Sequence, residues 1–182
     1  MPIRQAKVSD VKSIKSLADA LVVKAGDSGK TLGFYDYSLT SIQYLNRILS
    51  PLFFVAESHK GLEGFCMAYN FDFVRKLAEQ EPSLKKDVIF RYLLNLGDNY
   101  VYADQLAVRR LKTYAGSLVA CGLMDRLKEA STGNEAIIGV VPHHPWKNNS
   151  AIKFHMHQGA KLVEEIGSKD KIVFGVYRIN LS

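Results

Sequence analysis

Residues 106 to 118 read LAVRRLKTYAGSL, an apolar strand end that leads through a basic turn of small residues into a helix. The first N–H groups of a helix have no intrahelical acceptor, and the helix N-terminus carries partial positive charge. A phosphate placed there gains hydrogen bonds and a favourable field, to which Arg109, Arg110 and Lys112 add formal charge. The stretch therefore predicts an anion-binding site.

The composition of the 182-residue chain is that of a globular protein, with 47% hydrophobic and 23% charged residues. The length favours one domain over residues 1–182. No apolar run approaches the roughly 18 residues of a membrane-spanning helix, and the N-terminus has no signal-peptide pattern. We therefore expect a cytoplasmic protein without membrane contact.

The net charge of +6 allows nucleic acid, an anionic cofactor or only a soluble surface as its explanation. The basic residues are scattered along the chain, and their only local concentration at a strand-to-helix turn lies between Arg109 and Lys112. A compact polyphosphate ligand fits this distribution better than a duplex. We therefore expect no nucleic-acid partner.

Periodicity and turn signals predict a chain that alternates strands and helices. Pro51 and Pro142 are expected to end a helix and a strand, Ser9 to cap the first helix, and Ile42, Leu45, Ile48 and Leu49 to form the apolar face of the second. In order, we expect a strand at 2–6, helices at 9–21 and 42–49, a hairpin of 53–57 with 63–69, an insertion at about 70–99 with helical pieces at 73–79 and 86–94, a strand at 100–108, a helix at 115–130, a strand at 136–141, a helix at 150–158 ended by Gly159, and strands at 160–166 and 171–180.

The strand at 136–141 is apolar at every position, so we expect cover on both its faces. The helix before it can serve as the crossover that joins two parallel strands. The predicted fold class is therefore α/β, a central mixed sheet of about seven strands with helices on both faces.

Four segments of the chain together resemble the GNAT superfamily of acyl-CoA N-acetyltransferases: residues 3–17, the hairpin, the turn at 108–118 and the helix at 148–160. The resemblance covers nearly the whole chain. It implies transfer of an acetyl group from acetyl-CoA directly to a primary amine in a ternary complex, without a metal. The alternative is a non-catalytic acyl-CoA or nucleotide-binding module that keeps the same fold.

In that family, a Leu-x-Val-like strand end precedes an Arg/Gln-x-x-Gly-x-Gly/Ala turn whose amides hold the pyrophosphate of coenzyme A. Leu106 and Val108 match the strand end, and the turn pattern fits in part when started at Arg110, at Leu111 or at Thr113. The register stays open. The resemblance therefore assigns coenzyme binding to Leu106, Ala107, Val108, Arg110, Lys112, Thr113, Tyr114, Ala115, Gly116, Ser117 and Asn148.

The family's Asn-x-x-Ser/Ala-x-x-Phe-Tyr-x-x-x-Gly-Phe motif is met by Asn148, Ala151, Phe154 and Gly159, with His155 where a tyrosine commonly protonates the leaving thiolate. Histidine can donate a proton near neutral pH. The alternative is that His155 packs against the sheet or bonds a carbonyl.

The amine acceptor must lose a proton before it reacts, and Asp104 is the candidate base. By strand alternation it shares a face with Leu106 and Val108, on the strand that leads to the coenzyme turn. The alternative is a hydrogen-bonded carboxylate that supports the sheet. We expect the acceptor to be a small-molecule or peptide amine chosen by residues 24–40 and 70–99, and a homodimer is left open.

Two other motifs resemble a phosphate-binding loop and a metal site but lack residues that those sites need. Residues 26–31 read GDSGKT, but a phosphate-binding loop needs a glycine where Lys24 stands. His143, His144, His155 and His157 are clustered, but 155 and 157 point in different directions on a helix, and no carboxylate or cysteine lies among the four. We therefore expect neither nucleotide hydrolysis nor a metal site.

Overall fold

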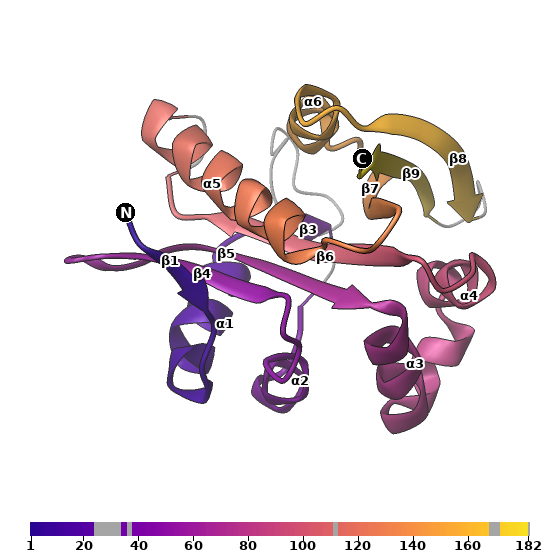
Figure 1. The fold of residues 1–182 in the computed structure, drawn as a ribbon, viewed down its shortest axis with the longest axis horizontal. Helices are drawn as coiled ribbons and strands as arrows, with labels where there is room; N and C mark the ends of the chain where they lie inside the picture. Colours follow the sequence, from indigo (N-terminus) through magenta and orange to yellow (C-terminus); the bar gives the residue numbers. More distant parts are fainter. Residues whose placement is uncertain (24–33, 36–37, 111–112, 168–171, 182) are drawn as a thin grey trace. The chain divides into compact units, whose positions relative to one another are not determined.

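Seven strands form one mixed sheet in the computed structural model, which describes residues 1–23, 34–35, 38–110, 113–167 and 172–181 (Figure 1). β2 (Val22–Val23) and β3 (Phe34–Tyr35) form a separate parallel pair. The predicted mixed α/β fold is therefore confirmed. The order along the sheet is β1 (Ile3–Gln5), β4 (Phe53–Ser58), β5 (Gly61–Asn70), β6 (Tyr100–Val108), β7 (Ala136–His144), β9 (Val173–Asn180) and β8 (Lys161–Gly167).

The chain divides into two compact units, each built from two stretches of sequence. The first unit contains Met1–Ala68 and Asp104–Thr132, and the second contains Tyr69–Ala103 and Gly133–Ser182. β6 contributes to both, because the division falls within it. The insertion expected at 70–99 lies wholly in the second unit. A single domain over 1–182 stays a prediction.

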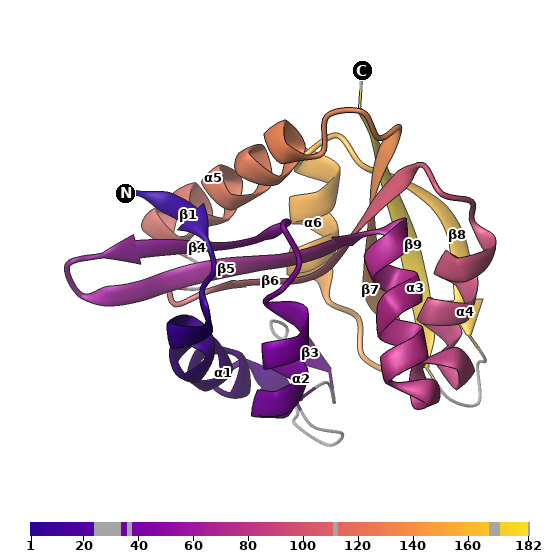
Figure 2. The ribbon, with the colours of Figure 1, turned by 60° about the horizontal axis from the view of Figure 1, so that its bottom comes forward.

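In the first unit, helices cover both faces of β4 and β5. α1 (Val11–Asp19) and α2 (Ser41–Arg47) lie on one face and α5 (Tyr114–Ala130) on the other (Figures 1 and 2). The ring of Phe65 on β5 contacts that of Tyr44 on α2, whereas a Cβ at neighbouring Gly64 would lie 3.0 Å from Val119 on α5. The apolar face predicted for α5 is confirmed by the burial of Val119, Ala120, Leu123, Met124 and Leu127.

Two predictions about the first helices are wrong. Ser9 does not cap α1, because it lies inside a 3-10 turn, η1 (Val8–Asp10), that runs into the helix. Of the four residues expected on the apolar face of the second helix, Ile48 is buried at its C-cap, but Ile42, Leu45 and Leu49 are exposed by 71%, 38% and 63%. The buried residues of α2 itself are Tyr44 and Arg47. A capping box of Thr40 and Gln43 starts this helix at Ser41, and the core takes its longer polar side chains.

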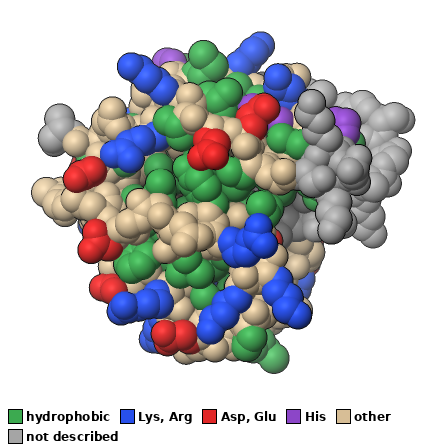
Figure 3. Space-filling view, turned by 90° about the vertical axis from the view of Figure 1, so that its right-hand side faces the viewer, with side chains coloured by type: hydrophobic (Ala, Val, Ile, Leu, Met, Phe, Trp, Pro, Cys, Tyr) green, Lys and Arg blue, Asp and Glu red, His purple; other side chains and the backbone are tan. Residues whose placement is uncertain are grey.

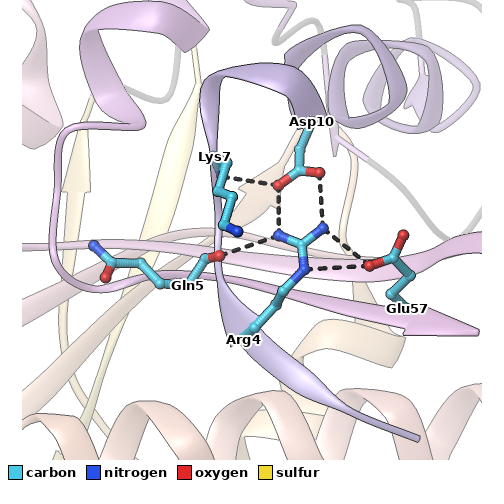
Figure 4. Close-up of polar contacts among 5 residues, drawn as sticks. All are labelled: Arg4, Gln5, Lys7, Asp10 and Glu57. Carbon is cyan, nitrogen blue, oxygen red and sulfur yellow. Dashed lines mark hydrogen bonds and ion pairs between the residues drawn. The ribbon is translucent and has the colours of Figure 1, made fainter.

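An ion cluster ties the start of the chain to the sheet of the first unit (Figure 4). The Arg4 guanidinium on β1 donates to both carboxylate oxygens of Asp10, at 2.7 and 2.9 Å, and to Glu57 on β4 at 2.9 Å. Asp10 also accepts the Lys7 backbone N–H at 2.8 Å. These bonds raise the pKa of Arg4 and lower that of Asp10, so both groups stay charged at neutral pH.

In the second unit, the start of β6 pairs in parallel with β7, from Tyr100 opposite Ala136 to Ala103 opposite Gly139. This confirms the predicted crossover. β7 also pairs with β9 and continues through Pro142, so the prediction that Pro142 ends it is wrong. A register shift between Pro142 and His144 accommodates the missing N–H, as bulges commonly do for proline in strands.

The remaining helices of the second unit are α3 (Phe71–Gln80), the 3-10 helix η2 (Pro82–Lys86), α4 (Val88–Asn95) and α6 (Asn149–His157). α3 and α4 confirm the two helical pieces predicted at 73–79 and 86–94, and η2 occupies the segment between them. Asn70 caps α3, and Asp87 caps α4 by accepting from two backbone N–H groups. Gly159 follows α6 with a φ of 86°, which a glycine adopts without strain. No helix in the described part of the chain is long and apolar enough to cross a membrane.

Candidate functional site

The turn after β6 leads directly into α5, so the predicted strand, turn and helix follow one another in the first unit. Thr113 is the N-cap: its Oγ1 accepts the Gly116 N–H at 3.0 Å and donates to the Arg110 carbonyl at 2.9 Å. The N–H groups of Tyr114 and Ala115 come too early to find an acceptor inside the helix. The helix start therefore presents donors of the kind that bind an anion.

Space, rather than backbone conformation, requires a glycine at 116. A Cβ there would lie 1.8 Å from the Arg110 carbonyl oxygen and 2.8 Å from its carbon, so any side chain would displace the turn. Tyr114, Ala115 and Ser117 around it are exposed. Gly116 therefore closes the turn, and the small Ala115 and Ser117 add little bulk at the helix start.

The basic residues of the turn differ in what they contact. Arg109 is tied to β5, because its N–H donates to the Glu63 carbonyl and its Nε to the Leu62 carbonyl, both at 2.8 Å. The Arg110 side chain is 49% exposed, and its Nε lies 3.7 Å from the Glu63 carboxylate. Arg110 is thus an accessible cation beside the turn. Lys112, also predicted to bind the coenzyme, lies outside the described residues.

The three strand residues predicted to bind the coenzyme are the last three residues of β6, immediately before the turn. Ala107 and Val108 are buried, and Leu106 is half-buried. Asp104 is half-buried too, and its charge adds to the effect of burial in raising the pKa of Tyr44. The candidate base therefore lies beside a buried phenol of α2.

Gln105, next to Asp104, has a buried amide nitrogen without a hydrogen-bond partner in the described structure. Gln105 is buried, and its Oε1 accepts the Tyr44 hydroxyl at 2.9 Å, while its Nε2 has no hydrogen-bond partner in the described structure. Buried amides are normally paired, so this donor is notable. Both roles predicted for Asp104, a base and a supporting carboxylate, fit a position next to this pair and stay predictions.

In the second unit, Asn148 starts α6. Its side-chain oxygen accepts the Ala151 N–H at 3.0 Å, and its own N–H donates to the Pro142 carbonyl at 3.2 Å. The first residue of the predicted motif is therefore an N-cap that joins α6 to the end of β7. A contact between Asn148 and a coenzyme stays a prediction.

His155 is packed rather than hydrogen-bonded. Its ring stacks on Tyr177, with 5.7 Å between centroids and 15° between planes, and lies so close to Gly139 that a Cβ there would meet it. Its Nδ1 is buried without a partner in the described structure, and burial lowers its pKa to about 4. The ring is therefore neutral at pH 7. Its position is that of the packing alternative, and its role as proton donor stays a prediction.

Three residues near His155 were missed as a group by the sequence analysis. They are His143 on β7 and its two hydrogen-bond partners, Glu165 on β8 and Tyr177 on β9. A signal was present, because Gly139 and Gly175 each interrupt a run of bulky residues in a buried strand. Glycine inside a strand often marks close approach of another group, here a histidine ring in both cases.

A groove of about 940 Å³ lies between α4 and β8 in the second unit. Figure 3 shows this face, with hydrophobic side chains between acidic and basic ones. Its lining includes Tyr92, Glu165 and Phe174 but none of the residues predicted to bind coenzyme.

Among the described residues, no three His, Cys, Asp or Glu side chains are grouped as metal ligands would be. The stretch 26–31 lies outside the described residues.

Comparisons with known proteins find likeness in structure alone. No protein-family model and no curated protein matches the chain. Ard1 from Thermoplasma volcanium aligns with a TM-score of 0.65 at 13% identity, over 100% of this chain and 97% of its own. An N-acetyltransferase from Staphylococcus aureus Mu50 aligns at 0.61 and 18%, over 100% and 98%. GphF, a GNAT-like decarboxylase solved with isobutyryl-CoA, aligns at 0.65 and 15%, over the whole of both chains. The chain therefore has the GNAT, or acyl-CoA N-acyltransferase, fold.

Proposed function

We propose that this chain is an acyl-CoA N-acyltransferase that transfers an acetyl group from acetyl-CoA directly to a primary amine. The observation that carries the proposal is the turn between β6 and α5. Thr113 caps the helix there, Gly116 closes the turn against the Arg110 carbonyl, and free helix donors are exposed beside an accessible arginine. The isobutyryl-CoA held by GphF, which shares the fold, supports an acyl-CoA as the ligand.

In this proposal the coenzyme pyrophosphate accepts the N–H groups of Tyr114 and Ala115, and Arg110 balances part of its charge. Asn148, which starts α6, stays a proposed coenzyme contact on the family resemblance alone. The acceptor amine loses a proton to Asp104, and its nitrogen then attacks the thioester carbonyl. The proposed acceptor is a small-molecule or peptide amine, and a cytoplasmic location stays a prediction.

One observation favours a second candidate, a module that binds acyl-CoA without turning it over. The residue at the position of the family's proton donor is His155, whose ring is neutral at pH 7 and has its Nδ1 buried. A neutral imidazole in an apolar setting is a poor acid. The two candidates share coenzyme binding and differ only in turnover.

Calorimetric titration with coenzyme A tests the shared claim, with a matched pair of variants at Ala115. Ala115→Glu places a carboxylate at the exposed helix start, whereas Ala115→Gln adds the same bulk without charge. We expect the Glu variant to lose at least tenfold more affinity than the Gln variant. Equal affinity in both would move the phosphate site elsewhere, and no binding by the wild-type chain would end both candidates. Turnover of acetyl-CoA against a panel of amines then separates them.

A further inference from the structure

β8 is the last strand of the sheet and has a neighbouring strand on one side only. It pairs with β9, and no strand lies beyond it in the described part of the chain. In an antiparallel pair, every second residue directs its backbone N–H and C=O away from the partner strand. The outer edge of β8 therefore carries backbone donors and acceptors that no strand of this sheet uses, and another extended chain can pair with them.

The two halves of this edge differ in regularity. A register shift between Leu162 and Glu164 interrupts the pairing with β9 in the first half, and such a bulge protects a strand edge against further pairing. From Glu164, opposite Val176, to Gly167, opposite Val173, the register is continuous. Residues 164–167 are therefore the part of the edge that can accept another strand without distortion.

The groove between α4 and β8, on the face that Figure 3 shows, follows this regular half. All four residues 164–167 line it. Glu164 faces α4, because it accepts the hydroxyl of Tyr92, whereas Glu165 faces the other side of the sheet, where it contacts His143. A groove confined to one face would be lined by alternate residues only. This groove therefore extends over the edge of β8.

The groove offers space and an apolar floor to an extended chain. Its volume of about 940 Å³ is near the upper end of the range for ligand sites. Ile166 on β8 and Phe174, directly opposite on β9, line it together with Val88 and Leu96 at the two ends of α4. Alternate side chains of a strand added to β8 would point toward these apolar groups.

The charges of the groove are not balanced. Its acidic side chains, on Asp87, Glu164 and Glu165, are already bonded to N–H groups of α4, to a tyrosine and to a histidine. Lys86 and Arg91 are exposed, and within the described ranges their side chains have no hydrogen bond or ion pair. The charge left for an occupant is therefore positive, which favours a ligand with carboxylates.

We propose that the groove between α4 and β8 binds an extended peptide segment of a partner protein. The segment pairs with residues 164–167 as an added strand and carries carboxylates for Lys86 and Arg91 beside apolar side chains. In this mode of recognition, backbone hydrogen bonds supply affinity and alternate side chains supply specificity. The surface lies wholly in the second unit and does not depend on acyl transfer, so either proposal can fail without the other.

The first test titrates the wild-type chain with three fluorescein-labelled octapeptides and follows the anisotropy. The probe alternates valine and aspartate, the second peptide alternates valine and lysine, and the third is the probe with every backbone nitrogen methylated. We expect saturable binding of the probe and binding weaker by about tenfold or more for the other two. Equal affinity for the lysine peptide or for the methylated peptide would refute the proposal, as would a probe that does not bind.

The second test compares two double variants that each lose one lysine and one arginine. Lys86→Gln with Arg91→Gln removes both free cations of the groove, whereas Lys85→Gln with Arg75→Gln removes exposed cations of the same unit that do not line it. We expect the first pair to weaken probe binding about fivefold or more and the second to leave it within about twofold. Equal losses would mean that net charge alone attracts the probe, and the groove would not be its site.

The third test locates the probe and examines a rival occupant, a second copy of this chain. On addition of the probe, the amide chemical shifts of residues 164–167 and of α4 should change most, and those of Lys161 and Leu162 least. Shifts that change elsewhere would overturn the assignment. Light scattering gives the oligomeric state, and a dimer that the probe neither binds nor dissociates would mean that a second copy covers the edge of β8, in which case the proposal is wrong.

Discussion

At the scale of single residues, four glycines differ in what an added side chain would contact. Gly139 and Gly175 lie in buried strands, where a side chain would strike a histidine ring. Gly116 lies in the first turn of α5, where a side chain would clash with the Arg110 backbone. Gly122 lies in the same helix, where a side chain would contact only the end of the Ile3 side chain. A clash with backbone cannot relax cheaply, whereas a side-chain end can move.

This contrast makes a stability prediction within one helix. Gly116→Ala should lower the free energy of unfolding by about 1–3 kcal/mol, because its Cβ would lie 1.8 Å from the Arg110 carbonyl oxygen. Gly122→Ala should be neutral or stabilise by up to about 1 kcal/mol, since alanine is the better helix residue and its nearest contact is flexible. Urea unfolding of both variants measures this, and a Gly116→Ala chain as stable as wild type would contradict the turn geometry.

Asp104 carries the proposed base chemistry at the residue scale. Asp104→Asn keeps size and polarity, so we expect kcat to fall by about 10²–10⁴ with coenzyme affinity unchanged. Asp125→Asn, at an exposed position of α5, is the control for loss of one carboxylate. Steady-state kinetics with calorimetric binding separates the effects. A variant with normal kcat would return Asp104 to supporting the sheet.

At the scale of elements, two helix caps allow structure and binding to be separated. Thr113→Ala removes the cap of α5 at the proposed phosphate site, and Asp87→Ala removes the cap of α4. Each should cost about 1 kcal/mol of stability. Only Thr113→Ala should also weaken coenzyme A binding, and Thr113→Ser should restore it. Equal affinities in Thr113→Ala and Asp87→Ala would exclude the α5 start from the site.

The elements that the sequence predicts well are those whose signals are local. The hairpin of β4 and β5 and the helix α5 follow from turn residues and a continuous apolar period. The end of β7 and the buried face of α2 do not, because a bulge against β9 keeps Pro142 in the strand and the core accepts Tyr44 and Arg47 through tertiary contacts. Periodicity carries no information about such partners.

At the scale of the whole molecule, one polar group in each unit shows the same difference between local and distant signals. The turn at Thr113 and Gly116 is contiguous in sequence, so its role as an anion site could be predicted from residue types. The Glu165, His143 and Tyr177 chain is assembled from three strands, and no spacing along the sequence brings them together. Such a group becomes visible only when the order of strands in the sheet is known.

As pH is lowered, the free energy of unfolding should decrease over two pH ranges, one caused by His155 and the other by Asp10. Asp10 is hydrogen-bonded by Arg4 and the Lys7 N–H, which lower its pKa in the folded state. Its stabilisation is therefore complete above the unfolded value of about 3.9 and is lost as pH falls further. Asp10→Asn should reduce stability at neutral pH and flatten this lower window. Asp72→Asn, which breaks an exposed ion pair with Arg75, should leave it unchanged.

The upper window belongs to His155, whose pKa burial lowers from about 6.5 to about 4. Between these values the unfolded chain binds a proton that the folded chain cannot, so the free energy of unfolding should fall by up to about 3 kcal/mol as pH drops from 6.5 to 4. His155→Phe should remove this slope, whereas His157→Gln, at an exposed position, should retain it. Urea midpoints taken every half pH unit from 7.5 to 2 measure both windows in the wild type and in all four variants. If the slope persists in His155→Phe, another group takes up the proton, and the His155 ring is not held neutral between Gly139 and Tyr177.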